Sequence, residues 1–130
     1  MPLVKIEIRK GKNKEYKSKL FEIVHQTLVD IVKIPDRDRM QRLYELDKDN
    51  FEISPGRTEN CTIIEITMFK GRTEETKKKF LHELSLHLKN ELHIEDNDLL
   101  IVLHEIPIEN WGLSGGKPAS EVNLGFKINV

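Results

Sequence analysis

Pro2, directly after Met1, is the residue of this chain with the most distinctive chemical potential. Removal of Met1 would leave a secondary amine at the N-terminus, with a pKa of about 8 before any perturbation. When neutral, such an amine is a general base, and it is also a nucleophile toward carbonyl carbon. Neighbouring cations or burial would disfavour its protonated form and lower that pKa. Proline after an initiator methionine is common, so its position alone leaves the catalytic hypothesis open.

Three charged residues that could act on a substrate lie beside turns. Lys70 and Arg72 flank Gly71 just before a predicted helix, and the N-terminus of a helix favours anions. They could instead only solvate their turn. Asp38 follows a polar turn and could orient a water molecule or a substrate hydroxyl, although a turn role is equally open.

An internal repeat decides which elements position these residues. A shift of 60 residues places 4–47 over 64–107 without a gap, and twelve of the 44 pairs are identical. The matches include turn residues, Gly11 with Gly71 and Asp38 with Asp98, which two unrelated amphipathic helices would not align. We therefore interpret the chain as two copies of one strand–helix–strand unit.

Each unit has the same predicted elements. A β-rich run ends at a glycine turn, and Asn13 or Thr73 then stands in the capping position of a helix with one apolar face. A polar turn leads into the second strand, and such a crossover within one sheet is parallel and right-handed. The expected strands are Leu3–Arg9, Met40–Leu46, Thr62–Phe69 and Leu99–Ile106.

The predicted fold class is α+β: a two-layer β-α-β unit repeated twice, with a four-stranded mixed sheet and two helices on one face. The chain is one domain, 1–130, with repeats 2–47 and 62–107, a connector 48–61 and a C-terminal tail 108–130. The tail ends in a β-like run, Val122–Val130, expected to form an extra strand, to wall a pocket and to pair with a neighbouring subunit. The sheet face without helices points to an oligomer.

A pseudo-twofold axis makes the two first strands antiparallel neighbours. Position 2, Asp38, Lys70 and Arg72 then converge at one edge of the sheet. The equivalent edge carries Lys10, Lys12 and Asp98, but Thr62 there is internal and has no free amine. Only the first edge can support chemistry of an N-terminal amine.

Composition excludes several classes of protein. The 21 basic and 22 acidic residues give a net charge of −1, so nothing favours nucleic acid as a partner. No apolar run is long enough to cross a membrane, and the N-terminus does not resemble a signal peptide. Cys61 is alone, as is typical of a reducing compartment, so we expect a soluble cytoplasmic protein. The five histidines show no metal-ligand spacing, and His25 and His82 are expected on the surface.

The chain resembles the tautomerase superfamily, and within it the malonate semialdehyde decarboxylase-like branch of fused double-length subunits. The likeness covers nearly the whole chain and rests on several residues and motifs that follow one another in the order typical of that family. They are Pro2 after Met, the duplication, the run Ile34–Gln41, Lys70-Gly71-Arg72 before a helix, and Glu109-Asn110-Trp111.

The resemblance implies a cofactor-independent homotrimer without metal, in which Pro2 is catalytic, Asp38 assists, and Lys70 and Arg72 hold a substrate carboxylate. Trp111 matches an aromatic wall of the site. Lys70 replaces an arginine, and Leu113 replaces an aromatic residue of the decarboxylase.

These departures favour a tautomerase of a 2-keto acid or 2-hydroxydienoate, with Trp111 and Leu113 excluding water. Decarboxylation of a 3-oxo acid such as malonate semialdehyde is the alternative. A non-catalytic ligand-binding trimer is the alternative of another class. Arg39 and Arg57 are weaker candidates for carboxylate binding, and a subunit boundary is one way in which they could reach the site.

Overall fold

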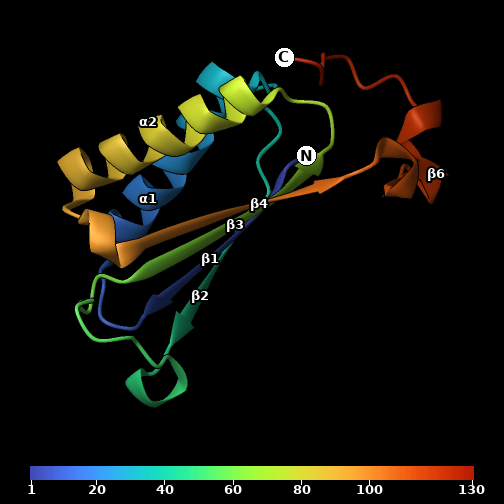
Figure 1. The fold of residues 1–130 in the computed structure, drawn as a ribbon. Coiled ribbons are helices and arrows are strands. Elements are labelled where there is room, and N and C mark those ends of the chain that lie inside the picture. Colours follow the sequence, from blue (N-terminus) through green and yellow to red (C-terminus); the bar gives the residue numbers. More distant parts are fainter.

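Four strands form one mixed sheet in the computed structural model, which describes residues 1–130, and two helices cover one face of that sheet (Figure 1). The strand order is β2-β1-β3-β4; β1 pairs with β2 and β3 with β4 in parallel, while β1 and β3 are antiparallel. The strands are β1 Leu3–Arg9, β2 Gln41–Leu46, β3 Thr62–Phe69 and β4 Leu99–Ile106. The predicted fold class is confirmed, and β2 begins one residue later than expected.

The pseudo-twofold axis of the repeat runs through the centre of the sheet. Lys5 of β1 pairs with Glu65 of β3, its own equivalent 60 residues later, and Val4 pairs with Ile66 as Ile6 pairs with Ile64. This register requires the two units to face each other symmetrically. The duplication seen in the sequence is therefore a duplication in space.

The helices begin and end at equivalent positions. Helix α1 spans Lys14–Thr27 and continues as a π-helical turn, Leu28–Val32, while α2 is a regular α-helix over Glu74–Leu92. The predicted caps are confirmed, because Asn13 and Thr73 each accept a hydrogen bond from a main-chain N–H of the first turn. Both helical segments end at a residue with left-handed backbone, Lys33 or His93.

The main core lies between the helices and the sheet. Alternate residues of β1 and β3 point toward the helices and are buried, as period-2 geometry requires. They meet the apolar faces of α1 and α2 in one cluster of 17 residues. Its fully buried members include Ile6, Leu20, Val24, Ile64, Ile66, Phe80, Leu84 and Leu88.

The C-terminal tail differs from its prediction. It forms a two-stranded hairpin of β5, Gly112–Leu113, and β6, Lys117–Pro118, but Val122–Val130 forms no strand. This segment instead runs back toward the start of α2, where Val130 O accepts a hydrogen bond from Thr73 N at 3.0 Å (Figure 1).

The surface prediction for His25 was also wrong, because its side chain is fully buried. Position 25 lies on the same side of α1 as Leu28 and Val32, which face the core. The ring Nε2 is 3.1 Å from Asp36 Oδ1, and this hydrogen bond compensates the burial of the polar ring.

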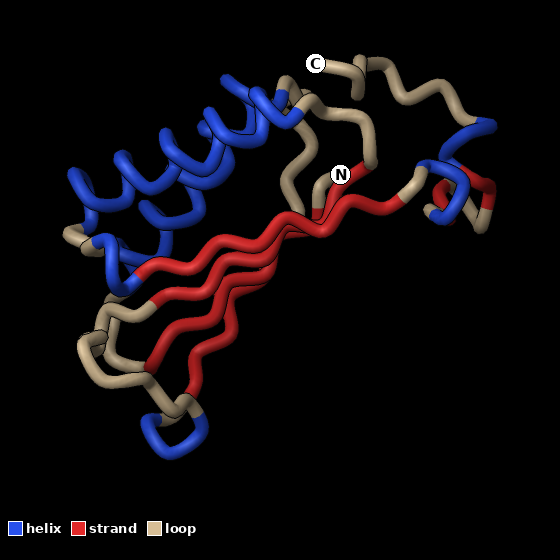
Figure 2. The backbone as a smooth tube through the Cα atoms, viewed as in Figure 1, coloured by secondary structure: helices blue, strands red, loops and turns tan.

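The sheet face opposite the helices is uncovered in the single chain (Figure 2). Tyr44 of β2 and Leu100 of β4 are exposed there at 45% and 49% of their surface. No helix of this chain combines the length and the apolar character needed to cross a membrane.

Candidate active site

The start of β1 lies beside the end of β3, as the repeat predicted. Leu3 pairs with Thr67, and Val4 N donates a hydrogen bond to Met40 O at 3.0 Å, which places the approach to β2 at the same edge. Pro2, the segment that carries Asp38 and the loop after β3 therefore meet. Each comes from a different part of the chain, and the sheet register holds them together.

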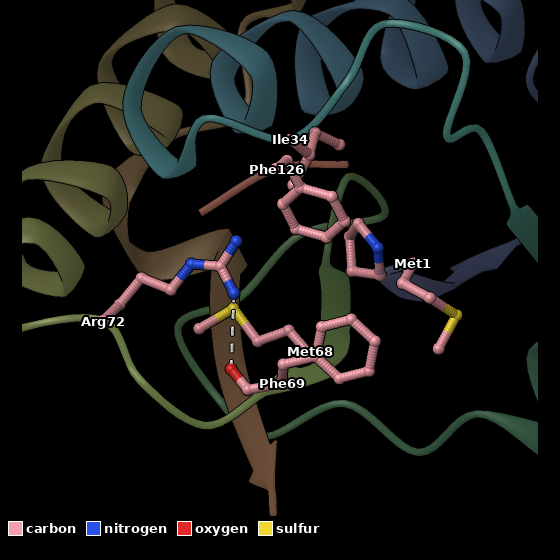
Figure 3. A pocket seen from close by; sticks show the side chains of 7 residues that line it. Met1, Ile34, Met68, Phe69, Arg72 and Phe126 are labelled. Atoms are coloured by element: carbon pink, nitrogen blue, oxygen red, sulfur yellow. Dashed lines mark hydrogen bonds between the residues drawn. The ribbon is translucent and has the colours of Figure 1, made fainter. Parts of the chain in front are cut away.

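A small hollow at this edge contains Pro2 and Arg72. Its lining is mainly apolar and consists of Met1, Pro2, Ile34, Met68, Phe69, Arg72 and Phe126. Side chains fill it so closely that no water-sized space stays open while Met1 is in place. The Arg72 side chain extends toward Met68 and Phe69, with Ile34 and Phe126 across from them (Figure 3).

Arg72 is a buried cation without a paired anion. Its side chain is 6% exposed, and its guanidinium donates to Val32 O at 3.2 Å and to Phe69 O at 3.4 Å. The Nε–H is buried and has no partner. Burial lowers the pKa of Arg72, and the charge of Glu105 acts in the opposite direction. Because a buried charge and an unpaired donor are both costly, this guanidinium is suited to receive an anion.

Asp38 lies close to the N-terminus but does not line the hollow. Its Oδ2 is 3.9 Å from the Met1 nitrogen, and 23% of its side chain is exposed. Asp38 N donates to Pro35 O at 3.0 Å, which fixes the turn before β2. The carboxylate is thus held within reach of the chain terminus.

Lys70 lies at the same edge but outside the hollow. Its side chain is exposed and takes no part in the lining. Its equivalent, Lys10, forms an ion pair with Asp47 at 3.1 Å, but the residue equivalent to Asp47 is Pro107. Lys70 therefore lacks the acidic partner that Lys10 has.

Trp111 and Leu113 lie behind the hollow and do not line it. Trp111 is buried edge-on against Phe69, with ring centroids 5.0 Å apart, and its Nε1 donates to Ile106 O at 3.2 Å. Leu113 packs against the same small cluster. The two residues support Phe69, which contacts the hollow directly.

Neither Arg39 nor Arg57 extends its side chain into the hollow within one chain. Arg39 Nη2 pairs with Glu22, and Arg57 Nη1 donates to Asn97 O at 2.6 Å. Neither residue lines the hollow.

Two family models, each described as "Tautomerase enzyme", match the chain, one over residues 38–114 and the other over residues 2–58. The chain belongs to the tautomerase family. The Bacillus subtilis (strain 168) protein named "Probable tautomerase YusQ" is 27% identical over 122 residues, which are 90% of this chain and 96% of that relative. The resemblance drawn from the sequence is confirmed.

Solved structures of tautomerase-family proteins have the same fold. FG41 malonate semialdehyde decarboxylase, inhibited by 3-bromopropiolate, superimposes with a TM-score of 0.77 at 26% identity, covering 89% of this chain and 92% of its own. A fused 4-OT wild-type symmetric trimer superimposes with a TM-score of 0.80 at 21% identity, covering 91% and 96%. At that identity, the second likeness shows the fold alone.

Four apolar lining residues were not predicted from the sequence. Met68 and Phe69 are the last residues of β3. The repeat places the end of this strand beside Pro2, so both residues could have been predicted from the sequence. Ile34 follows the left-handed residue Lys33 after α1. Phe126 lies in the tail that was expected to wall a pocket, but no pattern singled out this residue, because it reaches the hollow through an irregular segment that stacks it on Phe69 with centroids 6.2 Å apart.

Proposed function

We propose that this member of the tautomerase family moves a proton within a 2-keto acid or a 2-hydroxydienoate, with the amine of Pro2 as general base. Pro2 removes a proton from the enol hydroxyl or from carbon and returns it to the other position. The reaction needs a base, a cation for the carboxylate and a site free of water.

The observation that carries this proposal is the juxtaposition of Pro2 and Arg72 in one apolar hollow. A substrate carboxylate on the guanidinium would use the unpartnered Nε–H and neutralise a buried charge. It would also bring the reacting carbon of a small keto acid next to residue 2. Arg72 thus supports both substrate binding and stabilisation of the developing enolate oxygen.

The remaining predicted site residues have supporting roles. Lys70, exposed and without an acidic partner, attracts the substrate carboxylate to the mouth of the site. Asp38 orients a water molecule or the substrate hydroxyl. Trp111 and Leu113 hold Phe69 in place, so the apolar wall excludes water and keeps the amine neutral.

The proposal requires removal of Met1. Met1 acylates the nitrogen of Pro2, and its own side chain is part of the lining. Its loss would free both the secondary amine and space for a substrate. Burial and the nearby guanidinium would then disfavour the protonated amine and lower the pKa of Pro2.

Decarboxylation of a 3-oxo acid such as malonate semialdehyde is the second candidate. Two observations favour it: the structural similarity to a malonate semialdehyde decarboxylase, and the place of Asp38 at the same edge of the sheet as Pro2, within 3.9 Å of the nitrogen of Met1 that precedes it. In that reaction Asp38 would act on the substrate directly.

We also propose that the chain assembles as a homotrimer in the cytoplasm. The solved trimer of fused 4-OT with the same fold and the uncovered sheet face support the assembly. The single, buried Cys61 is consistent with a reducing compartment.

The deciding experiment compares the wild-type chain, shown by intact mass to lack Met1, with Pro2→Ala. Absorbance reports ketonisation of the enol of phenylpyruvate and of 2-hydroxymuconate. We expect activity well above the uncatalysed rate, with a loss of kcat/KM on the order of 100-fold in Pro2→Ala. Equal rates in both proteins would contradict a role of Pro2, and absence of turnover of either substrate would contradict the tautomerase proposal.

Asp38→Asn separates the two reactions. Its effect should be within about fivefold on ketonisation if Asp38 only orients, and about 100-fold or more on decarboxylation if Asp38 acts directly. Release of carbon dioxide from malonate semialdehyde measures the second reaction. A protein inactive in both assays that binds small carboxylates would instead be a non-catalytic binding protein.

A further inference from the structure

The helices of the two repeats differ in one local feature, the π-helical turn Leu28–Val32 that ends α1. The equivalent residues 88–92 of α2 are regular α-helix. Both helical segments have the same length and both end at a left-handed residue. A π-helical turn is rare and is frequently found at functional sites.

Thr27, directly before this turn, is the local cause. Its side chain is 5% exposed, and its Oγ1 donates to Ile23 O at 2.7 Å, one turn back along the helix. A hydroxyl that bonds the carbonyl four residues earlier competes with the main-chain ladder and distorts the helix. The residue equivalent to Thr27 is His87, which is exposed, lies within ion-pair distance of Glu83 and Glu91, and has no hydroxyl to bond the helix backbone. Only α1 therefore carries the distorting bond.

The consequence lies at the other end of the turn. Val32 is buried, and its carbonyl oxygen accepts a hydrogen bond from Arg72 Nη2 at 3.2 Å. Lys12, the equivalent of Arg72, bonds Asn60 and lies 4.9 Å from the centre of the Tyr16 ring, so no such contact with the helix end exists in the other repeat. The π-helical turn and the buried arginine thus occur together, in the same repeat.

We infer that Thr27 is a positioning residue: the π-helical turn that it begins presents Val32 O to Arg72 and fixes the guanidinium in the hollow. Val32 O and Phe69 O hold the two terminal nitrogens, which leaves Nε–H free for a ligand. A charged group buried among apolar side chains needs such fixed acceptors, since water does not orient it. The inference rests on the proposed role of Arg72 in binding a carboxylate.

Thr27→Val tests the inference, because it keeps the shape of the side chain and removes the hydroxyl. We expect KM for phenylpyruvate enol to rise about tenfold with kcat changed less than about threefold, because ground-state and transition-state binding weaken together. Thr27→Ser should restore the wild-type KM. His87→Val, the same change at the equivalent position of α2, should leave both constants unchanged.

A second readout isolates the carboxylate contact. Inhibition by 3-phenylpropionate should weaken about tenfold in Thr27→Val, while inhibition by the neutral 3-phenylpropionamide should stay the same. A general loosening of the fold would weaken both inhibitors alike and would overturn the inference. So would an unchanged Ki for the acid in a folded Thr27→Val or, should that variant fail to fold, in Thr27→Ala.

A double variant separates this inference from the proposed function. If Thr27 acts through Arg72, Thr27→Val should have no further effect on the carboxylate Ki in an Arg72→Gln background. Loss of carboxylate binding in Arg72→Gln together with wild-type binding in Thr27→Val would refute the positioning role alone. Wild-type carboxylate binding in Arg72→Gln would refute the proposed role of Arg72 itself.

Discussion

Equivalent acidic residues at the two ends of the sheet have different surroundings. Asp98 is buried and accepts hydrogen bonds from Thr58 N at 2.7 Å and Thr58 Oγ1 at 2.5 Å. Asp38, its equivalent, has only the chain terminus within ion-pair distance. The connector before β3 supplies Thr58, the partner of Asp98, whereas no side chain bonds Asp38. The duplication has therefore left one carboxylate structural and the other available.

The basic residues at the two ends of the sheet also differ in whether they have polar partners within the chain. Lys10 pairs with Asp47, and Lys12 bonds Asn60. Their equivalents Lys70 and Arg72 have no carboxylate partner. By contrast, Lys17 with Glu45 and Lys77 with Glu105 form the same ion pair in both repeats, each at 2.6 Å.

In this duplicated fold, differences between equivalent positions indicate where a ligand could bind. Polar groups that serve stability keep their partners in both copies, as the two lysine–glutamate pairs do. The charged groups at the Pro2 edge have no carboxylate or hydroxyl partner within the chain. An unpaired polar group costs free energy when it is buried, unless a bound ligand provides the missing partner. The asymmetry between equivalent positions is thus more informative than the residue types alone.

Among the variants at equivalent positions, Arg72→Gln should show the largest difference in activity from its counterpart. Loss of the buried cation should lower kcat/KM for phenylpyruvate enol on the order of 100-fold, as removal of an oxyanion-stabilising donor does. Lys12→Gln, at the equivalent position, should stay within about twofold of wild type. Equal losses in both variants would show that the two edges do not differ in function.

The two aspartates should separate in stability. Asp98→Ala removes a buried carboxylate and the two hydrogen bonds that it accepts from the exposed Thr58, so unfolding in urea should show a loss of about 2–3 kcal/mol. Asp38→Ala removes only a long, partly exposed ion pair and should cost less than about 0.5 kcal/mol. A large loss of stability in Asp38→Ala would make its role structural, like that of Asp98.

Lys70→Gln should have a smaller effect on substrate binding. Because Lys70 is exposed at the mouth of the hollow, its loss should raise KM about fivefold, and the difference should shrink at high salt. Lys10→Gln, which loses the exposed pair with Asp47, should leave KM unchanged. Steady-state kinetics at low and high ionic strength measures both effects, and a salt-independent KM difference would argue against an electrostatic role.

Tyr16 should give the smallest effect, at alkaline pH. Burial, and then the charge of Asp98, raise the pKa of Tyr16 above its usual value of 10.0. The folded state therefore holds this proton more tightly than the unfolded state. The contribution to stability is complete below pH 10 and is lost as pH rises through the folded-state pKa.

Tyr16→Phe should accordingly weaken the fall in unfolding free energy above pH 10. Urea unfolding at pH 8 and above pH 10 measures the difference. Identical slopes in wild type and Tyr16→Phe would show that the ring titrates as it does in solvent.

The sequence by itself determined the fold and the place of the site. Four β-rich runs, two capped helices and a gapless repeat predict a symmetric pair of strand–helix–strand units. That symmetry in turn places Pro2, Asp38 and the loop with Arg72 at one edge. These features are local or periodic, and the energy of a helix cap or a strand face depends little on distant residues.

Only the tertiary structure decided which polar groups are satisfied. The same residue type at equivalent positions, Asp38 and Asp98, gives no sign in sequence that Thr58 binds one of them. The burial of His25, the entry of Phe126 into the hollow and the exposure of Lys70 likewise depend on contacts between distant segments. Partners across 40 residues, such as Arg72 with Val32 or Asp98 with Thr58, are fixed by packing of the whole chain, and no periodic pattern encodes them.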